Sequence, residues 1–106
     1  MLDLNQMAEN MFNVALQRQK NGASISINPL AMLKHCATEV VEATEAYVRC
    51  VKDSTGEKYD SFSSEIADII ACALIISDNL GIDIEKALRE CYEKNRARVE
   101  GKGDKK

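Results

Sequence analysis

The chain of 106 residues has little of what most metal and redox sites require. It contains one histidine, His35, which is too few for a typical zinc or di-iron site. None of its four cysteines forms a C-x-x-C pair, and all of them fall within helical patterns beside apolar residues. We therefore expect reduced thiols in a core or an interface. The four are Cys36, Cys50, Cys72 and Cys91.

Other absences narrow the class of protein. No apolar run is long and uninterrupted enough to span a bilayer, and no secretory signal is present, so we expect a cytoplasmic protein without a membrane partner. The formal net charge of -3 argues against general binding to a nucleic acid polymer. A nucleotide substrate is compatible with this charge, because a bound metal ion inverts the local potential.

The chain does have helical periodicity, interrupted by short turn signals and without strand alternation. The pattern predicts helices over about residues 2–20, 29–52, 62–80 and 84–99, with a polar loop over 57–61. Asn28 and Pro29 mark the start of the second helix, Gly81 ends the third, and Asp83 caps the fourth. We expect an all-α, four-helix bundle as a single domain over residues 1–99, followed by a disordered tail over 100–106. Because the core of so short a chain is small, pairing of subunits is expected to complete it.

Two acidic motifs stand out, Glu39-Val-Val-Glu42 and Glu65-Ile-Ala-Asp68. Each places two carboxylates one helical turn apart, among apolar residues where a lone carboxylate is costly to keep. On a helical wheel, Glu39 belongs to a second face of its helix, whereas Glu42 lies at the edge of the polar wedge. Four carboxylates from two packed helices suit one hard cation, which we expect to be Mg²⁺ acting on a phosphorylated substrate.

The surroundings of both motifs predict burial. The second predicted helix carries an apolar stripe besides the face of Glu39, so we expect two buried or half-buried faces. The third is apolar almost all round from Ile66 to Ile76, and Asp68 interrupts it. Asp68 therefore needs a cation, a basic side chain or helix N-terminal amides. A purely structural ion-pair network with basic residues of the fourth helix is one alternative to a metal.

The motifs occur in a specific order. E-x-x-E is followed by a loop, by E-x-x-D, by the stretch LGIDIEKAL over 80–88 and by KNRAR over 94–98. From about Pro29 to Arg98, this order resembles the MazG-type all-α nucleoside triphosphate pyrophosphohydrolases. The resemblance implies a MazG-like four-helix bundle that forms a homodimer or homotetramer. Two departures are Thr38, where many members have a further Glu, and the absence of Trp, which many members use for base stacking.

The resemblance also implies an activity and a site. Members of the family cut a nucleoside triphosphate into the monophosphate and pyrophosphate, a reaction that suits housecleaning of the nucleotide pool. The implied ligands of Mg²⁺, or of Mn²⁺ in its place, are Glu39, Glu42, Glu65 and Asp68. The residues that match the family's phosphate-approaching basic end are Lys94, Asn95 and Arg98. Among the carboxylates we expect Glu42 to orient or deprotonate the attacking water, because it sits beside the polar wedge.

Two other interpretations stay open. One is a non-catalytic helical dimerisation module with an acidic ion-pair core, which predicts neither metal-dependent stabilisation nor nucleotide turnover. The other is a related pyrophosphohydrolase that acts on phosphoribosyl-ATP or on another phosphorylated compound.

Overall fold

The computed structural model describes residues 3–52 and 59–101 of the chain. Within these two ranges every regular element is a helix, and there is no strand. The four helices are α1 (Leu4–Lys20), α2 (Pro29–Lys52), α3 (Asp60–Asn79) and α4 (Ile84–Val99). The expectation of an all-α fold with four helices is confirmed, and the predicted ends differ from the observed ones by less than one helical turn.

The side chains predicted to cap the second and fourth helices accept backbone hydrogen bonds at the starts of those helices. Oδ1 of Asn28 accepts hydrogen bonds from two backbone N–H groups in the first turn of α2, at 3.0 and 3.3 Å, and Pro29 is the first residue of that helix. Oδ1 of Asp83 accepts a hydrogen bond from the backbone N–H of Lys86, at 3.1 Å, at the start of α4. After α3, Gly81 has a φ of +69°, a left-handed conformation that favours glycine.

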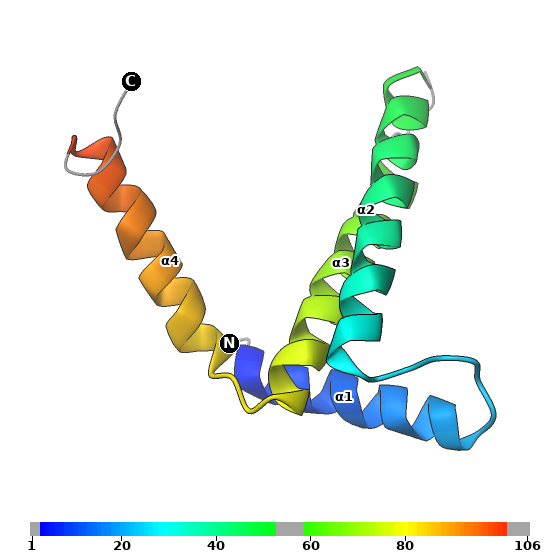
Figure 1. The fold of residues 1–106 in the computed structure, drawn as a ribbon. Coiled ribbons are helices and arrows are strands. Elements are labelled where there is room, and N and C mark those ends of the chain that lie inside the picture. The colour runs from blue at the N-terminus through cyan, green and yellow to red at the C-terminus, as the bar shows by residue number, and fades with distance from the viewer. Residues whose placement is uncertain (1–2, 53–58, 102–106) are drawn as a thin grey trace.

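The core lies between α2 and α3, which run antiparallel along each other, while α1 crosses the end of the pair where α2 begins (Figure 1). Small residues dominate this core, so the two helices approach closely. The buried residues of α2 are Met32, Glu39, Ala43, Ala46 and Cys50. α3 adds Cys72, Leu74 and Ser77, and α1 adds Ala8 and Ala15. The face of α2 that carries Glu39 is thus buried, as the helical wheel predicted.

The broad apolar stripe of α2 is largely left uncovered by the described residues. Its exposed members are Leu30, Leu33, Val40, Val41, Val48 and Val51, with exposed fractions between 46% and 62%. On α3, Ile66 and Ile70 are also exposed. Of the two faces of α2 expected to be buried or half-buried, this one is exposed within a single chain, because α4 diverges from α2 instead of packing on it (Figure 1).

α4 is attached to α1 near its first turn. The backbone N–H of Leu4 donates to Oε1 of Glu85 at 2.9 Å, and the Asn5 side chain bonds to both Asp83 and Ile84 at 3.0 Å. Beyond this attachment the helix extends away from α2 and α3 (Figure 1), and none of its residues is buried. α4 therefore contributes little to the core of its own chain.

Several smaller expectations can be compared with the structure. Cys50 and Cys72 are buried free thiols, as predicted, and Cys36 is half-buried, whereas Cys91 is exposed on α4. The predicted loop over 57–61 is wrong at its end, because α3 already begins at Asp60. Residues 57–58 of that loop and most of the predicted tail over 100–106 lie outside the described residues. Among the described residues, no helix is both long and apolar enough to cross a membrane.

Candidate metal centre

Three of the four predicted carboxylates meet at one point between α2 and α3. One carboxylate oxygen from each of Glu39, Glu42 and Glu65 lies within 4.8 Å of the other two. Glu39 and Glu42 come from successive turns of α2, and Glu65 projects from the facing part of α3. The cluster exists because the spacing of three residues puts both α2 carboxylates on the side of the helix that approaches α3.

Glu39 is the buried member of this cluster, with an exposed fraction of only 8%. Its Oε1 atom lies 3.0 Å from Nε2 of His35, one turn earlier on α2. Its Oε2 atom is buried and has no hydrogen-bond partner among the described residues. A buried carboxylate oxygen without a partner is costly, and a positive ion at this point removes the cost.

Glu65 is half-buried and interacts electrostatically with the other carboxylates of the cluster. Its pKa is raised above the ordinary value of 4.5, first by burial and then by the negative charges of Glu42, Glu39 and Asp68, with a further contribution from a hydrogen bond to Asp68. Each of these causes disfavours the ionised form of Glu65. The neighbouring carboxylates thus repel the charge of Glu65, and a divalent cation placed among them would offset this repulsion.

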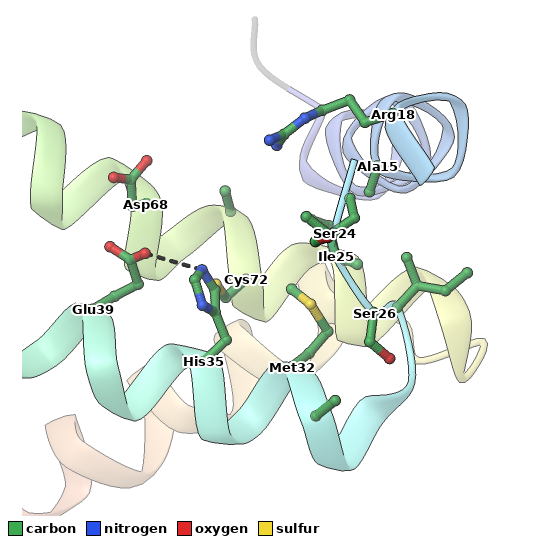
Figure 2. Close-up of a pocket in the computed structure, with 14 residues that line it drawn as sticks. Ala15, Arg18, Ser24, Ile25, Ser26, Met32, His35, Glu39, Asp68 and Cys72 are labelled. Carbon is green, nitrogen blue, oxygen red and sulfur yellow. Dashed lines mark ion pairs between the residues drawn. The ribbon is translucent and has the colours of Figure 1, made fainter. Parts of the chain in front are cut away.

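Asp68 lies one turn after Glu65 on α3, and its carboxylate faces that of Glu39 across the space between the two helices (Figure 2). In contrast to the expectation from the apolar sequence around it, Asp68 is exposed. Ile66 and Ile70 are exposed as well, so the described part of the chain covers the apolar surface of α3 only in part. Glu39, and not Asp68, is therefore the buried carboxylate whose charge needs a nearby cation.

A cavity of about 440 Å³ adjoins these carboxylates. Glu39 and Asp68 form part of its lining, and Met32 and Ile75 add apolar surface (Figure 2). The end of α1 and the connector over 24–27 close another side, where Arg18 reaches the lining. The volume falls within the range of small-molecule sites, and the combination of apolar walls with a few charged groups is typical of them.

The basic residues predicted to bind phosphate lie elsewhere in the chain. Lys94, Asn95 and Arg98 are exposed on α4, the helix that diverges from α2 and α3 (Figure 1). Asn95 Nδ2 donates to the backbone carbonyl of Cys91 at 2.9 Å, and Arg98 donates to Oδ1 of Asn95 at 3.4 Å. Within one chain these three residues therefore do not join the acidic cluster.

The sequence pattern does not single out two residues that line the cavity, His35 and Arg18. His35 was considered only as a zinc ligand, although its spacing of four residues from Glu39 already indicated contact on one helix face. In the sequence, Arg18 is only a basic residue near the end of a helix. Its place in the cavity lining results from the packing of α1 against α3, which the local sequence does not indicate.

The donor set fits a hard divalent cation. Mg²⁺ and Mn²⁺ prefer carboxylate oxygen over thiol and imidazole ligands, and three carboxylates with a fourth nearby provide that environment. The partnerless oxygen of Glu39 is the strongest single indication, since in the described residues nothing else offsets it. Comparisons of the chain with protein-family models, curated proteins and solved structures gave no significant match.

Proposed function

We propose that this protein is a Mg²⁺-dependent nucleoside triphosphate pyrophosphohydrolase of the MazG-like type, with Mn²⁺ able to replace Mg²⁺. The observation that carries the proposal is the buried, partnerless Oε2 of Glu39, within a carboxylate cluster that adjoins a ligand-sized cavity. The order of the acidic motifs, E-x-x-E and then E-x-x-D, supports it independently. Cytoplasmic housecleaning of non-standard nucleotides is the role that suits such an activity.

Each carboxylate has a place in this proposal. Glu39, Glu42, Glu65 and Asp68 hold the cation, and Glu39 is fixed on one side by His35. A divalent cation held there would offset phosphate charge and would make water at the site more acidic. Glu42 is exposed, so its second oxygen has access to solvent and orients or deprotonates the water that attacks the phosphate chain. The products are the nucleoside monophosphate and pyrophosphate.

The cavity provides the site for the nucleoside in this proposal. Its described lining holds no Phe, Tyr or Trp, so the base is held by aliphatic side chains and polar groups of the 24–27 connector instead of by aromatic stacking. Ser24 and Ser26 offer hydroxyl groups, and Met32 and Ile75 offer apolar contact. Such a pocket imposes weaker base selection than an aromatic clamp, which suits an enzyme that acts on several altered nucleotides.

The proposal includes a homodimer or homotetramer. The exposed apolar stripe of α2 and the neighbouring Ile66 and Ile70 of α3 form a surface that a second copy would cover. Because α4 diverges from its own acidic cluster, Lys94, Asn95 and Arg98 bind substrate in the site of the partner subunit in such an assembly.

Pyrophosphate release is the direct test. Purified protein is incubated with canonical and modified nucleoside triphosphates, with Mg²⁺, with Mn²⁺ or with a chelator. Metal-dependent release from at least one substrate is expected, and Asp68→Asn should abolish it while circular dichroism stays helical. Asp78→Asn, on the same helix but outside the cavity lining, is the matched control and should keep turnover. Full turnover by Asp68→Asn would contradict its role as a ligand.

The exposed apolar stripe also favours a second candidate, a non-catalytic dimerisation module. This alternative expects a stable dimer, no effect of Mg²⁺ on thermal stability and no turnover of any nucleotide. A third outcome is metal-dependent stabilisation without turnover of nucleoside triphosphates, which would direct the search to phosphoribosyl-ATP and other phosphorylated compounds.

A further inference from the structure

Arg18 is a cation in the lining of the cavity, and the described residues offer it no ion-pair partner. It lies in the last turn of α1, and its side chain extends from that helix toward the side of the cavity where Asp68 lies (Figure 2). Within the described residues its guanidinium makes neither a hydrogen bond nor an ion pair. An arginine whose guanidinium donors are unpaired, in the lining of a cavity beside a carboxylate cluster, is available for an anionic ligand.

Arg18 is exposed, and no ion pair along its own helix engages it. The residues three and four positions away on α1 or just beyond it are Val14, Ala15, Asn21 and Gly22, so no acidic partner is in helical reach. Arg96 on α4 shows the contrast, because it pairs with Glu93 at 2.7 Å and with Glu100 at 2.8 Å. A cation near a helix C-terminus is favourable, but Lys20 already supplies one there without lining the cavity.

Charge balance indicates what Arg18 binds. A divalent cation offsets two of the negative charges that Glu39, Glu42, Glu65 and Asp68 bring together, so the loaded site still repels a polyphosphate. Among the described residues that line the cavity, Arg18 is the only lysine or arginine. A guanidinium also presents paired N–H groups in the geometry that phosphate oxygens accept.

We infer that Arg18 binds oxygens of the phosphate chain of a ligand whose metal-bound end lies at the acidic cluster, and this inference rests on the proposed function. Arg18 thereby supplies, from α1 of the same chain, a phosphate contact that Lys94 and Arg98 cannot make there. It selects for ligands with an extended polyphosphate over nucleosides and monophosphates.

Calorimetric titration with inorganic tripolyphosphate in excess Mg²⁺ tests the inference without a base, a sugar or turnover. The wild-type protein should bind the probe, and Arg18→Ala should bind it roughly ten- to a hundredfold more weakly. Arg18→Lys should fall between the two, because an ammonium keeps the charge but loses the paired donors. Lys20→Ala, on the same helix end, is the matched control and should bind like the wild type. Circular dichroism verifies that each variant is helical.

Two outcomes would overturn the inference: equal affinity of Arg18→Ala and wild type, or no binding of tripolyphosphate by the wild type. Failure of the proposed function has a different signature. Arg18-dependent binding of tripolyphosphate without turnover of any nucleoside triphosphate would reject the hydrolase and leave the phosphate contact standing. Metal-dependent turnover, with tripolyphosphate binding that does not depend on Arg18, would support the hydrolase and reject the Arg18 contact.

Discussion

Glu39 is the residue on which the metal hypothesis depends most, because among the described residues only its carboxylate is buried and has one oxygen without a hydrogen-bond partner. We predict that Glu39→Gln leaves the metal-free protein at least as stable as the wild type, since the change removes a negative charge from a repulsive cluster. Mg²⁺ should stabilise the wild type by about 2.7 kcal/mol at a hundredfold excess over its dissociation constant, and should not stabilise the variant. Thermal unfolding with and without Mg²⁺ measures both effects.

The control for this experiment lies on the same helix. Glu45 is exposed on α2 and does not belong to the cluster, so Glu45→Gln should keep the full response to Mg²⁺. If Glu39→Gln destabilised the metal-free protein and still responded to Mg²⁺, the carboxylate would be a structural partner of His35 and not a metal ligand.

Glu65 predicts how stability depends on pH. Its pKa is raised in the folded protein above the ordinary value of 4.5, mainly by burial and then by the neighbouring carboxylates. The folded state therefore holds this proton more tightly than the unfolded state, so the contribution of Glu65 is most favourable below 4.5 and is lost as the pH rises through the raised value. In the presence of a chelator, the unfolding temperature of Glu65→Gln should exceed that of the wild type by a margin that grows over this pH window. A margin that is constant with pH would contradict the prediction.

At the scale of single residues, the sequence predicted which carboxylates come together more accurately than it predicted which of them are buried. The spacing of Glu39 and Glu42 was enough to place both on one helix face, and the wheel assigned Glu39 to the buried side. The burial of Asp68 was predicted incorrectly, because an apolar helix surface indicates what ought to be covered without indicating which chain covers it. Arg18 reaches the cavity through the crossing of α1 over α3, which local sequence does not encode.

At the scale of elements, the start of α2 is set by Asn28, whose side chain accepts two backbone hydrogen bonds. Asn28→Ala should lower the free energy of unfolding by about 1 kcal/mol, whereas Asn28→Asp should retain most of the stability. Chemical denaturation of the three proteins measures this difference. An equal loss in both variants would mean that the cap matters less than other contacts made by the Asn28 amide.

The helix boundaries were predictable because their signals are local. Asn28 with Pro29 and Asp83 act through hydrogen bonds and backbone preferences within a few residues, which is why both predicted starts agree with the structure. The direction of α4 was not predictable, because it depends on the bonds that Asn5 makes with Asp83 and Ile84, almost eighty positions away in the chain. The pattern therefore predicted four helices without predicting that the fourth leaves the bundle.

At the scale of the whole molecule, one chain is too extended for its length. The Cα radius of gyration is 16.7 Å, whereas a compact chain of this length is expected near 13 Å. No large side chain among the described residues is completely buried, and Val40, Val48 and Ile70 remain about half exposed. The proposed assembly of two or more copies would resolve both features, because it would cover the apolar surface and give α4 a surface on which to pack.

If α4 packs on a partner, two inactive variants should complement each other when they are mixed. Glu39→Gln lacks a metal ligand but keeps Lys94 and Arg98, whereas the double variant Lys94→Ala/Arg98→Ala has the reverse defect. Each is expected to be inactive or strongly impaired alone. After unfolding and refolding together, random dimers should recover about one quarter of wild-type turnover, because half of the dimers are mixed and each mixed dimer holds one intact site.

Complementation arises only if the basic residues act in the partner's site. If they acted in their own chain, every site of a mixed dimer would keep one defect and the mixture would be no more active than the separately refolded parents. Glu39→Gln mixed with Asp68→Asn is the matched control, because both defects lie on the α2 and α3 side of the site and no exchange of α4 repairs either. Activity in the first mixture and none in the second would show that the diverging helix of one chain completes the acidic cluster of another.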